Sequence, residues 1–392
     1  MSLLAVDEAL GLIRGAVTPT ELVETVPLVQ AGHRTLAEPI RAPRDQPPFA
    51  ASAMDGYGVR AADLPGSLRL VGESAAGRPF KGRVGPGECC RIFTGAPVPD
   101  GVDAVLIQEN ADVDADAVRS KETITPGRYV RAAGLDYRSG ATLLDAGALI
   151  DADKLALIAS TGAAQVKVRV RPKVAVIMSG DELRLPGDTL SSGDIYASNG
   201  VGVSQLIADA GGEPVDCGIV RDDRAKILDL LGTLQTEIVV TLGGASVGDH
   251  DLIAPCLREH GVDLRFWKLA MRPGKPILFG TRGKQLFLGL PGNPVSSLVG
   301  ARILLRPLVH AVLRRSVEDG RQFRPLAVDL PANGDREHYM RARTTTAGIE
   351  PLENQDSSLL AALAGADVLL VRERNEGPRK AGELVPIVPL RG

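Results

Sequence analysis

The sequence predicts a multidomain protein that combines a doubly wound α/β domain with further parts that are mostly β. Its 392 residues exceed one ordinary core, and about 150 residues per domain suggests two to four domains. The strand-like segments VAVIM (174–178), CGIV (217–220) and EIVVTL (237–242) alternate with helical segments. Continuous apolar strands separated by helices predict a parallel sheet covered on both faces. Short strands with Gly and Pro turns on either side of this stretch predict the β-rich parts.

The amino-terminal segment MSLLAVDEALGLIRG predicts an amphipathic helix, because its apolar residues recur at helical spacing around Asp7 and Glu8. It lacks the basic region that begins a signal peptide. No stretch of the sequence reaches the roughly 18 to 20 uncharged apolar residues that a membrane helix requires. We therefore expect a cytoplasmic protein that does not act at a membrane.

Prolines are dense between residues 20 and 50 and favour extended connections, with a boundary near residue 44. Further on, the helical DADKLALIASTG and the alternating strand AQVKVRV can pair with the amino-terminal region. The expected domains are residues 1–43 with 141–171, a β-rich domain at 44–140, the α/β domain at 172–314 and a β domain at 315–392.

The charge and the metal-binding residue types exclude several classes of function. The formal net charge is −3, which leaves no general excess of Lys and Arg for binding a nucleic-acid backbone. The four cysteines form no CxxC pair, so we expect them to be reduced and structural. The five histidines show no HxxxH or HExxH spacing, and a metal here is expected to have oxygen ligands.

Acidic side chains follow each of the three predicted parallel strands: Glu182 after the first, Asp222 after the second and Asp251 after the third. Ligands of open parallel sheets bind beyond the carboxyl ends of the strands, where these loops meet. The three carboxylates suggest a Mg²⁺ site completed by substrate oxygens. Helix caps and solvated turns remain the alternative interpretation of each carboxylate taken alone.

The run TLGGASVGDHD (241–251) predicts a turn that binds an anion. Gly243 and Gly244 let the backbone approach a ligand, the next helix adds partial positive charge, and Ser246 can donate a hydrogen bond. A Gly-rich strand-to-helix turn, with Asp249 or Asp251 as the cap, is the structural alternative.

A basic edge follows in WKLAMRPGKP, where Lys275 lies between prolines that stiffen the turn and could hold an oxyanion. A solvated basic loop is the alternative. The rigid turn LPGNPVSS then places Ser296 near a helix start. By spacing alone, Asp55 in SAMDGY, Thr94 in RIFTGAPVP, Arg341 and the NQDSS segment (354–358) look like ordinary turn or strand residues.

Six motifs, in order and spacing, resemble the molybdopterin molybdenumtransferase family, which includes bacterial MoeA and the gephyrin E domain. They are SAMDGY, RIFTGAPVP, SGDEL, GGASVGDHD, MRPGKP and GLPGNPVS, and the resemblance runs from about residue 7 to 390. It implies an elongated first domain, an α/β domain similar to molybdopterin adenylyltransferase and a small C-terminal β-barrel.

The resemblance also implies a reaction and its partners. Molybdate enters adenylyl-molybdopterin with the help of Mg²⁺, and AMP is released. The active site lies between two subunits of a homodimer, so that Asp55 and Thr94 face the partner's cleft, and Asp136 matches an acid in the loop RAAGLDYRSG. A molybdopterin adenylyltransferase and chaperones of molybdoenzymes are possible further partners.

Position by position, the resemblance assigns Glu182, Asp222 and Asp251 to an acidic cluster that serves catalysis and metal binding, and Asp55 and Asp136 to catalysis. It assigns the remaining positions to contacts with pterin phosphate or oxyanion: Thr94, Gly243, Gly244, Ser246, Lys275, Pro276, Ser296, Arg341 and Ser357.

The sequence departs from the family at Ser179, usually Thr, at Ala197, usually an acid, and at Leu135, usually Glu. The last two remove carboxylates and leave metal affinity and full activity open. Two other functions stay open beside the transferase. One is a nucleotidyl transferase that adenylylates molybdopterin with ATP, and the other is a non-catalytic dimeric scaffold that presents a peptide groove.

Overall fold

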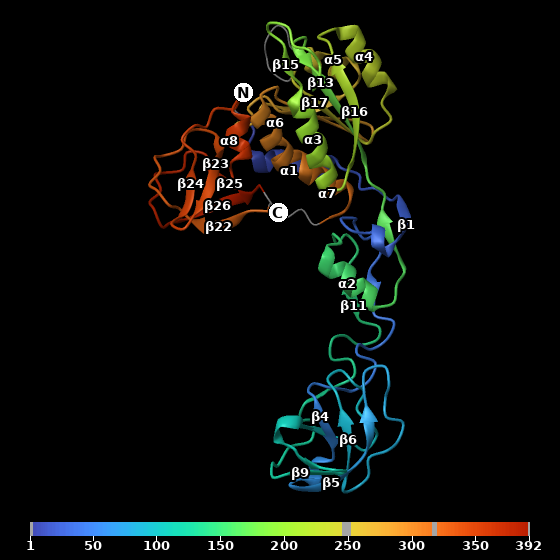
Figure 1. Cartoon of the computed structure of the whole chain (residues 1–392). Coiled ribbons are helices and arrows are strands. Elements are labelled where there is room, and N and C mark those ends of the chain that lie inside the picture. Colours follow the sequence, from blue (N-terminus) through green and yellow to red (C-terminus); the bar gives the residue numbers. More distant parts are fainter. Residues whose placement is uncertain (1–2, 245–251, 316–319, 391–392) are drawn as a thin grey trace. The chain divides into compact units, whose positions relative to one another are not determined.

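The computed structural model describes residues 3–244, 252–315 and 320–390 (Figure 1). Its contacts divide the chain into two units. The first contains Met1–Ala37, Gly147–Ala152 and Gln165–Gly392, and the second contains Glu38–Ala146 and Asp153–Ala164. The four-domain division expected from the sequence is finer than these two units and stays a prediction.

The first unit is built around a sheet with the strand order β16-β13-β17-β21-β20-β18. Neighbouring strands from β16 to β21 are parallel, which confirms the predicted doubly wound half, whereas β20 and β18 add antiparallel neighbours. A two-residue turn starting at Gly283, with φ 58°, joins β20 to β21 and forces this reversal. The strands are β13 (Lys173–Ser179), β16 (Glu213–Val220), β17 (Ile238–Leu242), β18 (Asp263–Trp267), β20 (Leu278–Arg282) and β21 (Gln285–Leu290).

Both faces of this sheet are buried, because alternate residues of each strand enter different cores. In β13, Val174 and Val176 join one core and Ala175 and Ile177 join the other. Figure 1 shows α3, α6 and α7 on one side of the sheet and α4 with α5 on the other. These helices are α3 (Ser198–Asp209), α4 (Arg224–Thr233), α5 (Ile253–Glu259), α6 (Pro294–Gly300) and α7 (Arg306–Val312).

A π-helical turn, Ala301–Leu305, connects α6 to α7 into one helical run from Pro294 to Val312. By length and composition this run could cross a membrane, and it was not anticipated from the sequence. However, 72% of its most apolar window is buried inside the protein, as in the core helix of a globular domain. Among the described residues no other helix passes that test.

The C-terminal strands form the predicted β-barrel. The sheet runs β19-β23-β25-β26-β22, and β24 pairs with the other end of β23. A bridge between Leu326 and Ile349 connects the chain after β22 to β24 and closes the ring. The strands are β19 (Met271–Arg272), β22 (Gln322–Pro325), β23 (Glu337–Thr345), β24 (Gly348–Pro351), β25 (Val368–Arg372) and β26 (Leu384–Pro389), with the short helix α8 (Leu360–Ala364) between β24 and β25.

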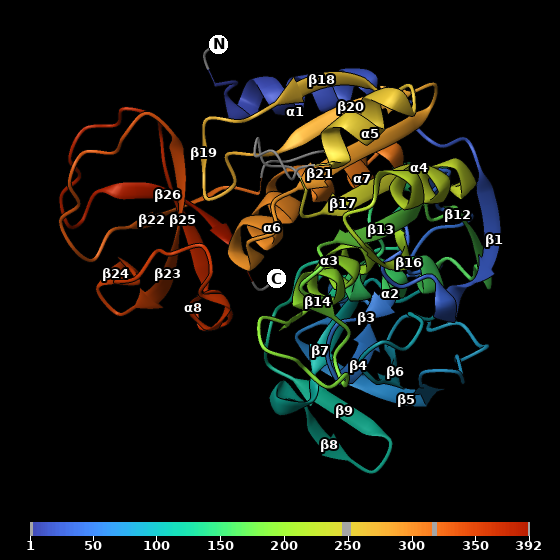
Figure 2. The same ribbon diagram turned by 90° about the horizontal axis from the view of Figure 1, so that it is seen from above.

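The barrel and the α/β sheet share one core, since Tyr339, Leu369 and Val388 pack in the same cluster as Val176 and Leu288. The amino-terminal helix α1 (Val6–Ala16) contributes Val6, Ala9 and Ile13 to this cluster, as its amphipathic pattern predicts. Figure 2 shows the C-terminal strands set apart from the six-stranded sheet, with β19 leading toward them. One continuous core therefore fixes the barrel against the α/β layers.

Strand β1 (Val23–Pro27) pairs antiparallel with β12 (Gln165–Arg169), which confirms the expected pairing of these two regions. The second unit holds a sheet of order β7-β4-β6-β5-β9-β8, together with helix α2 (Ala152–Ser160) and the short pair β2 (Ile40–Arg41) and β11 (Thr142–Leu144). Its strands are β4 (Gly56–Val59), β5 (Gly66–Ser74), β6 (Glu88–Ile92), β7 (Ala104–Ile107), β8 (Asp112–Asp114) and β9 (Ala117–Ser120), and a further pair joins β3 (Ala51–Ser52) to β10 (Val130–Arg131).

All four cysteines are free, as predicted. Burial, with smaller effects of neighbouring groups, raises the pKa of Cys89 to about 12 and that of Cys90 to about 11. Both thiols on β6 are therefore protonated at neutral pH and act as small core residues, because the thiolate is the reactive form of cysteine.

Candidate functional site

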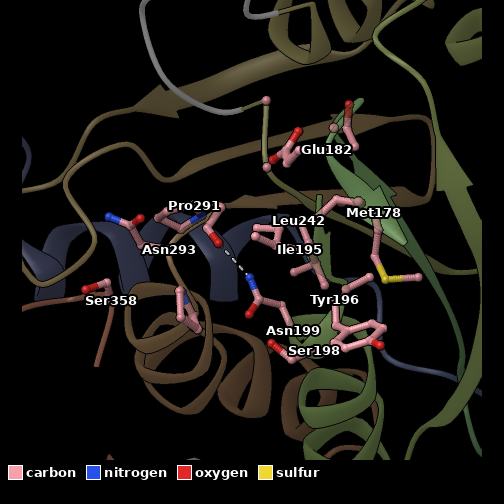
Figure 3. A pocket seen from close by; sticks show the side chains of 18 of the residues that line it. Met178, Glu182, Ile195, Tyr196, Ser198, Asn199, Leu242, Pro291, Asn293 and Ser358 are labelled. Atoms are coloured by element: carbon pink, nitrogen blue, oxygen red, sulfur yellow. Dashed lines mark hydrogen bonds between the residues drawn. The ribbon is translucent and has the colours of Figure 1, made fainter. Parts of the chain in front are cut away.

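A cavity of about 870 Å³ opens in the first unit, beyond the carboxyl ends of β13, β17 and β21. Its lining contains Glu182, Asp222, Gly243, Gly244 and Pro276, which are five of the residues selected from the sequence. Figure 3 shows the side chains of this lining, with Glu182 and Met178 on one side and Asn293 and Ser358 on the other. The structure thus brings together segments that are up to about 180 residues apart in the chain, at the place expected for a parallel sheet.

Asp222 is held by the end of a neighbouring strand. Ser179, the buried last residue of β13, donates its hydroxyl hydrogen bond to Asp222 Oδ1 at 2.7 Å. The next residue, Asp223, has a different task, because its carboxylate accepts hydrogen bonds from the amides of Ala225 and Lys226 and caps α4. Of these two neighbouring acids, Asp222 alone lines the cavity.

Glu182 lies on the loop after β13 and is exposed. Its carboxylate folds back over Gly180, where an added Cβ would lie 2.6 Å from Glu182 Oε2. Among the described residues, none donates a hydrogen bond to this carboxylate. The loop itself is fixed, since Ile195 donates its amide to the Glu182 carbonyl at 2.9 Å and β14 (Leu183–Arg184) pairs with β15 (Ile195–Tyr196).

The glycine-rich turn differs in one respect from the predicted anion cradle. The amide of Gly243 already donates to the Leu290 carbonyl at 3.1 Å. Gly243 has a φ of 91°, and a Cβ there would lie 2.6 Å from the Ser179 carbonyl oxygen. This glycine is thus required because two strand ends approach closely. Ser246 and Asp251, predicted to bind the anion and the metal, lie outside the described residues.

The opposite wall of the cavity is neutral and held by hydrogen bonds. Asn199, near the start of α3, donates Nδ2 to the Gly292 carbonyl at 2.6 Å (Figure 3). Asn293 donates Nδ2 to Ser357 Oγ at 3.0 Å, and the Ser297 hydroxyl donates to the Pro291 carbonyl. Sequence reasoning missed Asn199 and Asn293. Asn293 stands in a motif that was selected for Ser296, and Asn199 had no distinguishing signal.

Arg341 supports this wall from behind. It is fully buried on β23 and does not line the cavity, and its predicted contact with an oxyanion stays a prediction. Its Nη2 donates to the carbonyls of Asn354 and Asp356, each at 3.1 Å, and its amide donates to Gln355 Oε1 at 2.9 Å. Arg341 thereby shapes the loop that presents Ser358 to the cavity. Its Nε and Nη1 have no partner among the described residues.

The remaining candidates of the first unit are placed beside the cavity. Lys275 is exposed next to Pro276, and its carbonyl accepts the amides of Leu269 and Ile277. Ser296 is buried in the first turn of α6, behind the lining residue Pro294. Ser357 accepts from Asn293, while its neighbour Ser358 reaches the lining.

The second unit carries Asp55, Thr94 and Asp136, all of them exposed. Thr94 donates its amide at 2.7 Å and its hydroxyl at 2.8 Å to Asp55 Oδ1. These two hydrogen bonds, and more weakly the charge of Arg91, hold the pKa of Asp55 below its usual range. Asp136 is fixed by its backbone, because its amide donates to the Gln46 carbonyl at 2.9 Å.

Three family models match consecutive parts of the chain. The MoeA N-terminal region (domain I and II) matches residues 4–162, the probable molybdopterin binding domain matches 175–311, and the MoeA C-terminal region (domain IV) matches 324–390. The chain is also similar along almost its whole length to a molybdopterin molybdenumtransferase of Haemophilus influenzae. The two are 35% identical over 95% of this chain and 94% of the relative.

The chain belongs to the molybdopterin molybdenumtransferase family.

A second member of the family, molybdopterin molybdenumtransferase 2 of Mycobacterium tuberculosis, is 36% identical over 72% of this chain and 73% of its own. The crystal structure of a molybdopterin biosynthesis MoeA protein from Pyrococcus horikoshii OT3 superposes with a TM-score of 0.86, at 26% identity over 98% of this chain and 99% of that one. Membership of the family makes the protein a transferase of molybdenum cofactor biosynthesis, and it confirms the multidomain fold expected from the motifs.

Proposed function

We propose that this member of the family inserts molybdate into adenylyl-molybdopterin, giving molybdenum-molybdopterin and releasing AMP. The observation that supports it is the cavity of about 870 Å³, in which Glu182 and Asp222 lie at the ends of neighbouring strands. Its volume falls within the range of roughly 300 to 1,000 Å³ typical of small-molecule sites. A nucleotide joined to a pterin needs a site toward the upper end of that range.

The donor atoms of the cavity suit Mg²⁺. Magnesium prefers oxygen ligands and is usually bound through one or two carboxylates together with substrate phosphates and water. Glu182 and Asp222 supply two carboxylates on one wall, and Asp251 follows the next parallel strand but lies outside the described residues. No group of three or more His, Cys, Asp or Glu side chains that could hold a metal occurs within residues 3–244, 252–315 and 320–390. A metal held by two carboxylates and the substrate is the arrangement we propose.

The other residues of the lining can contact the rest of the substrate. Tyr196 and Ile195 present apolar surface that can cover a flat ring, and the turn held by Asn199 and Asn293 presents backbone to the ligand. When bound, Mg²⁺ would offset negative charge on the phosphoanhydride. The protein itself positions the reactants. In the reaction an oxygen of molybdate or water attacks the adenylyl phosphorus, so that the phosphoanhydride bond breaks and AMP leaves. The two dithiolene sulfurs bind molybdenum in place of oxo ligands, which take up protons and leave as water, and the oxidation state of molybdenum does not change.

The proposed enzyme is a homodimer in which Asp55 and Thr94 of one subunit complete the cavity of the other. In the second unit, exposed apolar side chains flank the exposed acids: Met54, 39% exposed, precedes Asp55, and Leu135, 64% exposed, precedes Asp136. Covering these two apolar side chains with a second subunit would remove apolar surface from water, which favours association.

Complementation tests this arrangement. Glu182→Ala and Asp55→Ala homodimers should each be inactive, because each lacks one half of every site. Mixing the two variants under conditions of subunit exchange should restore up to about a quarter of wild-type turnover, since random exchange gives half heterodimers with one intact site in two. Recovery of no activity in verified heterodimers would contradict a shared site.

The reaction itself is tested by incubating the purified protein with adenylyl-molybdopterin, Mg²⁺ and molybdate and measuring AMP. AMP release should depend on molybdate, and tungstate in a parallel assay determines the oxyanion preference. Consumption of ATP with molybdopterin would instead show an adenylyltransferase, and release of no AMP under any of these conditions would favour a non-catalytic scaffold.

A further inference from the structure

A separate cavity of about 150 Å³ lies in the first unit, where α1, residues 302–307 of the helical run Pro294–Val312 and the C-terminal barrel meet. Four arginines contribute to its lining, together with one carboxylate and a tyrosine: Arg14, Arg302, Arg306, Arg321, Asp7 and Tyr339. It shares no lining residue with the larger cavity. The family's motifs selected from the sequence do not include any of these arginines.

The arginines come from different elements. Arg302 and Arg306 lie four residues apart on the helical run and so on neighbouring turns of one face. Arg14 lies in the last turn of α1, and Arg321 precedes β22. Since α1 packs against α7, the cations of separate helices are brought to one place.

Carboxylates compensate only part of this charge. Arg321 donates to Glu337 Oε1 at 2.8 Å, and Glu337 also accepts the Tyr339 hydroxyl at 2.7 Å. Arg302 donates to the Leu298 carbonyl at 3.1 Å and lies near enough to Asp209 for its pKa to respond to that charge. Asp7 is the one carboxylate among the described residues that line this cavity.

The Arg306 side chain has no hydrogen bond or ion pair with any described residue, although the residue is half-buried. Burial lowers its pKa. Arg306 in turn acts on its neighbours as an uncompensated cation. It adds to the effect of burial in lowering the pKa of Arg302, and it adds to the effects of burial and Arg315 in lowering the pKa of His310 to about 4. His310 is therefore neutral at neutral pH, and the positive charge in this region comes from the arginines alone.

We propose that this cavity is a binding site for a small tetrahedral oxyanion of the phosphate class, with Arg306 and Arg14 as its principal ligands. A guanidinium group matches such oxygens with paired N–H donors. A volume of about 150 Å³ corresponds to about five water molecules at roughly 30 Å³ each, and a tetrahedral oxyanion has five heavy atoms. A nucleotide does not fit this volume.

Calorimetric titration of the full-length protein with inorganic phosphate tests the proposal, at ionic strength held constant with chloride. The wild type should bind one phosphate per chain saturably. Arg306→Met should weaken binding about tenfold or more, the loss expected for a charge-assisted hydrogen bond of roughly 1.5 to 3 kcal/mol. A parallel titration with molybdate tells whether the site accepts both oxyanions or phosphate alone, and molybdate binding is assigned to this site only where Arg306→Met weakens it, because the larger cavity is also proposed to receive molybdate.

Matched variants distinguish phosphate binding in this cavity from phosphate binding elsewhere on the protein. Arg14→Gln, at an exposed position on α1, should weaken binding as Arg306→Met does and does not disturb the helical run. Arg343→Gln removes an exposed arginine of the barrel that pairs with Glu350, and Glu182→Ala alters the larger cavity, so both should bind phosphate with wild-type affinity. Absence of saturable binding by the wild type, or undiminished binding by both Arg306→Met and Arg14→Gln, would overturn the proposal.

Discussion

The two units hold their functional carboxylates in different ways. In the second unit, Asp55 accepts two hydrogen bonds from Thr94 on a single oxygen, whereas in the first unit Asp222 accepts one from Ser179. Glu182 lies on the same wall of the cavity as Asp222, and its carboxylate accepts no hydrogen bond from the described residues. The number of protein donors thus falls from Asp55 to Asp222 to Glu182.

This difference indicates which carboxylate is available to a ligand. An oxygen that already accepts protein hydrogen bonds is fixed in position, and its pKa is lowered, as for Asp55. A carboxylate without protein donors keeps its lone pairs for metal or substrate but has a less defined position. We therefore expect that turnover depends most on the carboxylate of Glu182. The contribution of Asp222 should depend on its hydrogen bond from Ser179. The contribution of Asp55 should be the least sensitive to loss of a supporting side chain, that of Thr94.

The largest effect is predicted for Glu182→Gln. Replacing the carboxylate by an amide of the same shape should lower turnover by about two to three orders of magnitude, comparable with the loss of a key electrostatic contact in other enzymes. It should also raise the Mg²⁺ concentration needed for half-maximal AMP release. Asp181→Asn is the matched control, because Asp181 is an exposed acid that pairs with Arg221 and does not line the cavity. Wild-type turnover by Glu182→Gln would refute the order of importance given above.

A smaller effect is predicted for Ser179→Ala. It leaves Asp222 in place but removes the hydrogen bond of 2.7 Å that orients it, and loss of such a supporting contact typically costs roughly 10- to 100-fold. The Mg²⁺ requirement should shift along with turnover, a response that a merely structural defect does not produce. Ser179→Thr retains the hydroxyl and should restore both properties. Equal Mg²⁺ requirements in Ser179→Ala and the wild type would show that Asp222 is positioned by other contacts.

Much of this architecture could be predicted from local patterns. The continuous apolar strands at 174–178 and 237–242 gave the parallel sheet, and the rule that ligands bind at strand ends placed Glu182 and Asp222 in one cavity. The antiparallel edge formed by β18 and β20 was missed, because β18 carries Asp263 and Arg265 and lacks the continuous apolar pattern, and the short turn at Gly283 reverses the chain.

The supporting contacts of the site could not be predicted in the same way. Arg341 looks ordinary by spacing, and the resemblance assigns it to binding an oxyanion; only the three-dimensional structure shows that it is buried behind the loop 354–358. Asn199 and Asn293 act through partners about 60 to 95 residues away in the chain. Hydrogen bonds over such distances leave no periodicity or spacing in one sequence.

The smallest effect is predicted for Thr94→Val, which removes one of the two donors to Asp55 and keeps the amide. The pKa of Asp55, followed by NMR, should rise toward the ordinary value of 3.8. Because the folded-state pKa is lowered in the wild type, the associated stability is present above the unfolded-state pKa and is lost as the pH falls through the folded-state pKa. The melting temperatures of Thr94→Val and the wild type should therefore converge as the pH falls through the lowered pKa of Asp55. At neutral pH, turnover should fall less than about tenfold, since the amide of Thr94 still orients the carboxylate. A loss as large as that of Glu182→Gln would mean that the Thr94 hydroxyl itself contacts the substrate, and the contrast between supported and free carboxylates would no longer explain the site.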